Sequence, residues 1–171
     1  MSDDSVPPSG STTEKPGVDA ELPTVLDIAG LALTRRDSPP SLACWTGGFP
    51  VPPGADPVEV SLVIEPPAPP DETTLWLARD VVSRFDVFVD RALEYCRTRL
   101  REEHFGLTAE ELNRLDLPEP PLGMPGATVW ADRTWAIHFA ESGLCMGDPY
   151  GILVTFDGTR PVDVQGVDDE Q

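Results

Sequence analysis

The sequence has few of the residues from which catalytic and metal sites are built. Its 171 residues include two histidines and three cysteines, without Cys-x-x-Cys or His-x-x-x-His spacing. Structural and catalytic metal ions need several N, S or O ligands converging at roughly 2 Å. No glycine-rich loop precedes a helix, since Gly47-Gly48 is followed by proline-rich sequence. We therefore expect no metal site, no nucleotide site and no other cofactor.

Long apolar runs are also missing. No stretch approaches the roughly 20 residues that span a bilayer. The first residues, Met1-Ser2-Asp3-Asp4-Ser5, are acidic and polar, unlike a secretory signal. Because Cys44, Cys96 and Cys145 are odd in number and form no paired motif, we expect free, buried thiols in a reducing compartment. These features predict a cytoplasmic protein without membrane contact.

Basic residues are scarce beside acidic ones. Twelve Lys and Arg stand against 30 Asp and Glu, for a formal charge of −18, and Lys15 is the only lysine. Residues 24–161 alone hold 21 acids and 11 bases, so the body of the protein is acidic and not only its ends. Such a chain repels nucleic acid and anionic lipid. A macromolecular partner should therefore be a basic protein.

The remaining composition is that of a folded protein with many loops. Apolar residues make up 40% and charged residues 25%, enough for one core, while 20 prolines and 14 glycines predict frequent breaks. Residues 1–23 contain almost no large apolar side chain and are predicted to be a disordered tail rich in Pro, Ser and Thr. Residues 167–171 form a short acidic tail. One domain is expected over residues 24–166.

Apolar periodicity predicts strands first and helices second. Three extended segments come before residue 65, at 25–34, 42–46 and 58–64, and the last alternates with period two. Residues 71–101 then repeat apolar side chains at steps of three and four, as an amphipathic helix does. Because about 30 residues exceed the usual helix length, we expect a break near residues 83–86.

A second group of strands follows. Thr108 and Glu111 form a capping-box pattern that begins a short helix, and a loop is expected over residues 118–126. Strand patterns return at 128–131, 135–140, 150–156 and 162–165, with Asp157-Gly158 as a tight turn. The order predicts an α+β fold: an antiparallel sheet of about six strands, three N-terminal and the rest a C-terminal meander, with helices on one face.

Only one pair of residues suggests catalysis. His138 lies in a strand, on the face opposite Trp135, and Cys145 lies in the following Gly143–Gly147 loop, where it could approach the imidazole. No nucleophile motif accompanies Cys145, and packing of a buried thiol is the simpler interpretation. We assign no catalytic residue. A small enzyme that uses His138 with Cys145 or a carboxylate remains an alternative.

The segment Asp148-Pro149-Tyr150-Gly151-Ile152 is more distinctive. Asp-Pro followed by Gly defines a turn before a core strand, and that turn could simply set the strand register. A functional interpretation places Glu141, Asp148 and Tyr150 on one exposed edge that binds a partner, since Tyr is a favoured interface anchor. By contrast, Arg97, Arg99 and Arg101 lie among glutamates and are expected to complement a helix C-terminus.

Two segments resemble small bacterial α+β immunity proteins that accompany polymorphic toxins. In one such group a long helix ending in Ala-Leu-x-Tyr-Tyr precedes strands that bracket a Trp-Asp-Pro-Glu-His-Gly-Leu segment. Ala92-Leu93-Glu94-Tyr95-Cys96 is similar to the first element. Asp148-Pro149-Tyr150-Gly151-Ile152 is similar to the second, with Gly147 in place of the Trp and Tyr150 in place of the Glu-His pair. The likeness covers about residues 58–165.

The resemblance implies a non-enzymatic protein that binds a toxin effector and blocks it. An acidic body suits a basic, nucleic-acid-cleaving toxin, because complementary potentials accelerate encounter and disfavour wrong partners. A second alternative is an accessory or scaffold protein that binds through its proline-rich N-terminus.

Overall fold

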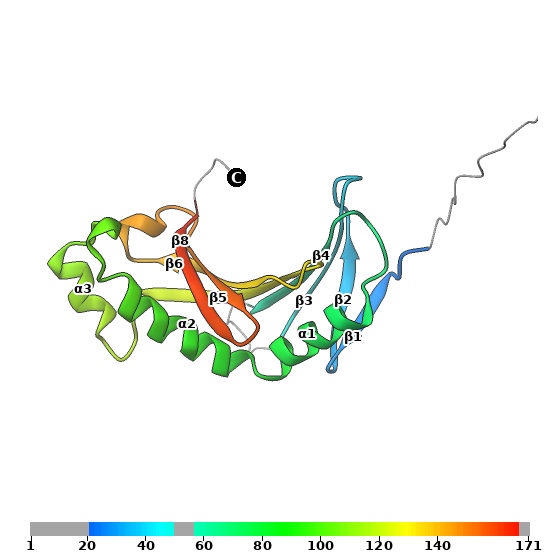
Figure 1. The fold of residues 1–171 in the computed structure, drawn as a ribbon, viewed down its shortest axis with the longest axis horizontal. Helices are drawn as coiled ribbons and strands as arrows, with labels where there is room; N and C mark the ends of the chain where they lie inside the picture. The colour runs from blue at the N-terminus through cyan, green and yellow to red at the C-terminus, as the bar shows by residue number, and fades with distance from the viewer. Residues whose placement is uncertain (1–20, 50–56, 168–171) are drawn as a thin grey trace, which may run out of the picture.

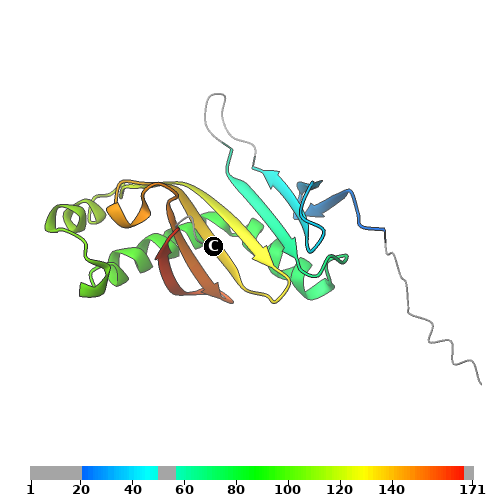
Figure 2. The same ribbon diagram turned by 90° about the horizontal axis from the view of Figure 1, so that it is seen from above.

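The computed structural model, which describes residues 21–49 and 57–167, has an α+β fold (Figure 1). Eight strands form one sheet in which each strand lies beside its neighbours in sequence, from β1 to β8. The helices α1, α2 and α3 come between β4 and β5; α1 and α2 lie along one side of the sheet, and α3 lies beyond one end of it (Figures 1 and 2). The strands are β1 (Val25–Ile28), β2 (Leu31–Arg36), β3 (Ala43–Gly48), β4 (Glu59–Ile64), β5 (Leu122–Trp130), β6 (Trp135–Ser142), β7 (Ile152–Asp157) and β8 (Arg160–Gly166).

The sheet is mixed, which corrects the expectation of an antiparallel sheet of about six strands. Every neighbouring pair is antiparallel except β4 and β5, which run parallel with Val60 opposite Ala127 and Val63 opposite Trp130. A parallel pair needs a crossover that carries the chain back to the starting edge. The three helices supply that crossover. The sheet therefore consists of two four-stranded antiparallel halves joined at one parallel seam.

The prediction missed one strand because the apolar run over residues 25–34 folds as a hairpin of two strands. The sequence predicted a single strand over residues 25–34, but β1 and β2 form a hairpin whose turn residues Ala29 and Gly30 have φ of 53° and 84°. Two central residues with positive φ match the twist of the flanking strands. Asp27 accepts the backbone N–H of Gly30 at 3.0 Å and stabilises this turn.

The loop expected over residues 118–126 was partly wrong, because β5 begins at Leu122. Its first half contains Gly123, Pro125 and Gly126, which weaken a strand pattern. Pairing with β4 begins only at Ala127, so residues 122–126 pair with β6 alone. Pro125 therefore lies where its missing N–H removes no bond to β4.

The predicted break in the long helix is confirmed at Arg84. It separates α1 (Glu72–Ser83) from α2 (Phe85–Arg99), and Arg84 has a non-helical φ of −124°. Asp71 accepts the Thr74 N–H at 2.7 Å and caps α1. A 3₁₀ turn, η1 (Glu103–Phe105), then leads to α3 (Ala109–Leu115), which begins with the predicted capping box. Among the described residues no helix is long and apolar enough to cross a membrane.

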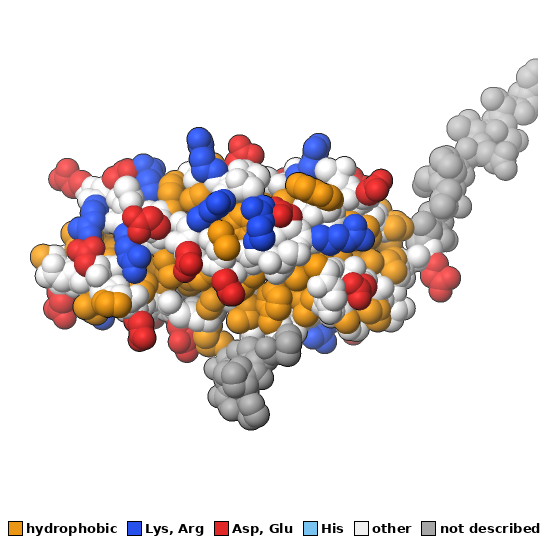
Figure 3. Space-filling model, turned by 90° about the horizontal axis from the view of Figure 1, so that it is seen from below, with side chains coloured by type: hydrophobic (Ala, Val, Ile, Leu, Met, Phe, Trp, Pro, Cys, Tyr) orange, Lys and Arg blue, Asp and Glu red, His pale blue; other side chains and the backbone are white. Residues whose placement is uncertain are grey.

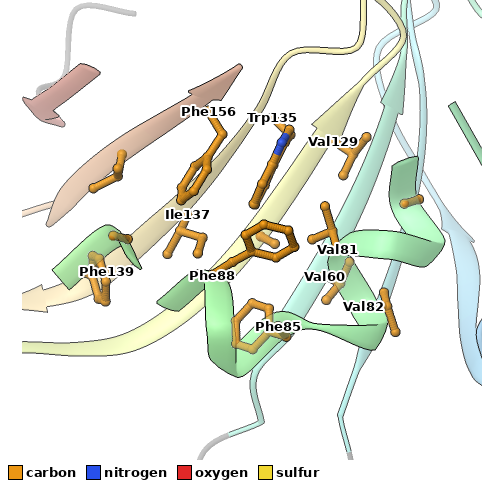
Figure 4. Close-up of a cluster of buried hydrophobic side chains, with 14 of the residues drawn as sticks. Val60, Val81, Val82, Phe85, Phe88, Val129, Trp135, Ile137, Phe139 and Phe156 are labelled. Atoms are coloured by element: carbon orange, nitrogen blue, oxygen red, sulfur yellow. The ribbon is translucent and has the colours of Figure 1, made fainter. Parts of the chain in front are cut away.

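The core lies between α1–α2 and the sheet and is centred on aromatic rings (Figure 4). Phe88 of α2 meets Trp135 edge-on, with ring centroids 4.8 Å apart, and Phe156 at 5.9 Å. Trp135 stacks on Phe156 at 4.1 Å, and its indole N–H donates to the Gly158 carbonyl at 2.7 Å. Every polar atom that these large rings bring into the interior thus has a partner.

Most of the predicted tail regions lie outside the described residues, namely 1–20 and 168–171. Of the described ends, Leu22 packs against the core and the Pro23 carbonyl accepts the Trp45 indole N–H at 2.7 Å. Val167 donates its N–H to the Gly151 carbonyl at 3.0 Å.

Truncating Phe88 should be among the most damaging single changes. Phe88 is fully buried, and Phe88→Ala should lower the free energy of unfolding by about 3–5 kcal/mol because it leaves a cavity beside the stacked rings of Trp135 and Phe156. Chemical denaturation measures this. The matched change in the adjacent, half-exposed Val87, Val87→Ala, should stay within about 0.5 kcal/mol. Equal losses for the two variants would contradict this account of the core.

Candidate functional site

The sheet has a second face that no helix of the described residues covers. We call it the open face: the strand positions that alternate with those packed against α1 and α2. Figure 2 shows the strands in front of the helices on this side. Cross-strand partners share a face of a sheet, so the register shows which side chains line up there. One row crosses all eight strands: Val25, Thr34, Thr46, Ser61, Thr128, Ala136, Thr155 and Asp163.

Five of the eight side chains in that row carry a hydroxyl group, and we call them the hydroxyl row: Thr34, Thr46, Ser61, Thr128 and Thr155. Threonine is favoured in strands because its branched Cβ fits the pleated surface. Ser61, Thr128 and Thr155 are half-buried although no helix lies over them. Thr46 is buried, and its hydroxyl accepts a hydrogen bond from the Arg36 guanidinium at 2.5 Å. The row therefore offers small side chains with hydrogen-bonding groups across the middle of the open face of a curved sheet (Figure 1).

Beside the hydroxyl row lies a hollow of about 530 Å³. Val63, Trp130 and Leu153 supply its apolar surface, and Val63 and Trp130 are direct partners across the parallel seam. Its lining is completed by Glu65, Ala131, Asp132, Thr134 and Thr155. We call this feature the hollow. It has an aromatic ring and two carboxylates but no basic residue in its lining.

Negative charge is concentrated away from the helices. Residues 71–116, which contain all three α-helices, hold 11 acidic and seven basic residues, while the other described residues hold 11 acidic and only four basic ones. Figure 3 views the helix side, where blue and red side chains alternate. By strand alternation Glu59, Glu65 and Asp163 lie on the open face, with Arg36 as a basic neighbour. The strands and loops thus carry a larger net negative charge than the helical region, and part of that charge lies on the open face.

Two of the three predicted partner-binding residues lie next to this face. Asp148 and Tyr150 are exposed in the turn before β7. The Tyr150 carbonyl is 2.6 Å from Nε2 of His138, whose strand position is on the open face opposite Leu153. The prediction that His138 and Trp135 point to opposite faces of β6 agrees with the burial of these residues.

Glu141 lies at the same end of β6 as this turn, because β7 starts at Ile152 opposite Phe139 and the turn with Asp148 and Tyr150 comes directly before it. By strand alternation, however, Glu141 shares the face of Phe139 and not that of His138, and it lines a separate, shallow hollow with Pro121 and Gly143. The structure therefore places Asp148 and Tyr150 at the edge of the open face, and Glu141 at the same end of the strand on the other face. That all three residues bind a partner stays a prediction.

The environment of Cys145 differs from the one the sequence suggested. We expected buried thiols, but only Cys96 is buried; Cys44 is half-buried and Cys145 is exposed. Burial raises the pKa of the Cys96 thiol to about 12. The Glu111 carboxylate, by accepting a hydrogen bond from Cys145 and by its charge, raises the pKa of the Cys145 thiol. A thiol nucleophile needs the opposite shift.

The imidazole is also engaged elsewhere. His138 Nε2 faces the Tyr150 carbonyl, and no hydrogen bond between His138 and Cys145 occurs within residues 21–49 and 57–167. The same part of the chain contains no group of three His, Cys, Asp or Glu side chains that could hold a metal ion. The described geometry therefore does not pair the His138 imidazole with the Cys145 thiol.

Glu111 acts as a structural tie. It is buried, completes the capping box with Thr108 and accepts the Cys145 backbone N–H at 2.8 Å. These backbone and hydroxyl hydrogen bonds lower its pKa to about 2. One carboxylate therefore holds the start of α3 to the 3₁₀ turn η2 (Cys145–Gly147), which precedes Asp148 and Tyr150.

Sequence reasoning missed the hydroxyl row and the hollow. Thr46, Ser61 and Thr128 are visible as small polar residues at alternating strand positions. Their alignment is not visible, because it depends on the parallel register of β4 and β5.

Comparison with protein-family models, curated proteins and solved structures finds no match for the chain.

Replacing Glu111 should change how the stability of the protein depends on pH. The folded-state pKa of Glu111 lies near 2 against 4.5 ordinarily, so its contribution is full above about pH 4.5 and is lost as the pH falls toward 2. Glu111→Gln should lower stability at neutral pH and flatten the decline over that range. Denaturation curves from pH 2 to 7 measure it. Glu110→Gln, at an exposed neighbour, serves as the control; an unchanged pH slope in Glu111→Gln would refute the tie.

Proposed function

We propose that the protein is a non-catalytic binding module that holds a basic protein on its open face. The observation that carries this proposal is the uncovered sheet face, with its hydroxyl row beside a hollow and carboxylates around both. An antiparallel sheet commonly packs one face on the core and leaves the other solvated, with polar side chains on it. Here the centre is made of small, half-buried side chains that a partner surface can approach closely.

The charge distribution favours a basic partner. The described residues outside 71–116 carry nearly three acidic residues for each basic one. Complementary potential raises the association rate and discriminates against acidic partners and nucleic acid. The hydroxyl groups of the row can donate or accept, so they suit either backbone or side-chain groups of the partner.

The resemblance to immunity proteins gives the proposal its most specific form. In that form the partner is a toxin effector that the protein meets in the cytoplasm and blocks by binding. Asp148 and Tyr150, the residues that carry the second element of the resemblance, lie at the edge of the open face. A basic, nucleic-acid-cleaving effector would have the charge that this face attracts.

Blocking the centre of the open face tests the proposal. Thr128→Arg puts a long cation in the hydroxyl row, while Thr98→Arg makes the same substitution at an exposed site of α2 on the helix side. We expect native lysate capture to recover a basic protein whose retention falls at least about tenfold with Thr128→Arg and is unchanged with Thr98→Arg. Equal retention by the two variants, or an acidic partner, would refute binding at this face.

Two further measurements address the form of the function. Co-expression with the product of the neighbouring gene should rescue growth if that product is a toxin and this protein neutralises it. Deletion of residues 1–20 distinguishes the open face from the scaffold alternative. The partner should still be captured if it binds the open face, and it should be lost if it binds the proline-rich N-terminus.

A further inference from the structure

We propose that the hollow receives an arginine side chain of the partner, with the guanidinium plane against the ring of Trp130 and its N–H groups directed to Glu65 and Asp132. This deepens the proposed function, on which it rests, by assigning one contact and its chemistry. In the hollow an aromatic ring, two carboxylates and an apolar lining occur together on the open face.

The backbone holds the aromatic wall in place. Trp130 pairs with Val63 across the parallel seam, its N–H donates to the Thr134 carbonyl at 2.9 Å, and the next N–H, of Ala131, donates to the Val63 carbonyl at 3.1 Å. Trp130 is half-buried, whereas Trp45 and Trp135 are fully buried in the core. The ring is thus anchored and still reachable from solvent.

One carboxylate is already oriented. Oδ1 of Asp132 accepts the Thr134 N–H at 2.9 Å and the Thr134 hydroxyl at 2.6 Å, while Oδ2 has no hydrogen-bond partner among the described residues. Glu65 likewise has no ion-pair partner in residues 21–49 and 57–167. The hollow therefore presents negative charge that the protein itself does not neutralise.

The nearest basic residue is directed elsewhere. Arg133 does not line the hollow, although it follows Asp132 directly. Its charge instead contributes to lowering the pKa of Asp71, at the start of α1. No basic residue in the lining of the hollow therefore competes with an external cation for Glu65 and Asp132.

Arginine fits these features better than the other cations that proteins offer. A guanidinium is planar, stacks on aromatic faces and donates hydrogen bonds in a fork that matches carboxylates. Its methylene stem can lie against Val63 and Leu153. A metal ion lacks the ligand set, as no three suitable side chains gather in the described part of the chain. A lysine ammonium would gain the charge attraction but not the stacking or the fork.

A single-arginine probe tests the site in the full-length protein. The probe is a blocked Gly-Arg-Gly peptide, added to ¹⁵N-labelled protein while the four indole N–H signals are followed by NMR; Trp130→Phe assigns the relevant signal. We expect a saturable shift of the Trp130 signal, a weaker one with Gly-Lys-Gly and none with Gly-Glu-Gly. Trp76, which is 65% exposed on α1, is the internal control and should not shift. Equal shifts of Trp76 and Trp130 would mean diffuse charge attraction and overturn the proposal.

Matched charge variants separate the hollow from the overall charge. Glu65→Gln with Asp132→Asn removes two negative charges from the hollow, and Asn keeps the Oδ1 acceptor for Thr134. Glu103→Gln with Glu110→Gln removes two from exposed helical sites. The first double variant should bind the probe about tenfold more weakly, and the second within about twofold of the parent. Equal weakening by both would refute the site.

The two proposals fail separately. If the arginine probe binds at Trp130 but Thr128→Arg retains the same proteins as the parent, the hollow is right and the proposed function is wrong. If a basic partner is lost with Thr128→Arg but binds the hollow double variant as tightly as the parent, the open face is right and the arginine site is wrong.

Discussion

The packing of the apolar side chains of α1 and α2 against one face of the sheet is the interaction on which the rest of the structure depends. Phe88 packs edge-on against Trp135 and Phe156, which stack on each other, and the large side chains of the strands point toward the helices. Because strand side chains alternate, burying one set of strand residues against the helices places every second residue of each strand on the opposite face. The hydroxyl row is the consequence of where the aromatic residues are buried.

The elements that could be predicted from the sequence are those that local pattern determines. The break at Arg84, the capping box of Thr108 and Glu111 and the Asp157-Gly158 turn each depend on a few neighbouring residues. The β1–β2 turn was missed because Ala29 adopts a positive φ, which alanine rarely does, so the sequence gives no sign of a turn there. The parallel seam was missed because it depends on how three helices carry the chain across the sheet.

The same distinction holds for the candidate site. The exposed turn that carries Asp148 and Tyr150 could be predicted, since an Asp-Pro turn before a strand is a local feature. Glu141 was grouped with them because it is close in sequence. It does lie at the same end of β6, but strand alternation puts it on the face of Phe139 and not on that of His138. Trp130 and Asp132 come from one segment and Val63 and Glu65 from another, about 65 residues earlier. Only the sheet brings them together.

The seam between β4 and β5 has a consequence for when the molecule becomes able to bind. Each antiparallel half is built from hairpins and other short-range pairings, which close quickly, whereas the parallel contact must wait until the chain of α1–α3 has crossed between them. The hydroxyl row and the hollow both span that junction. A nascent or partly unfolded chain therefore displays neither the complete hydroxyl row nor the hollow, and only the finished fold presents both.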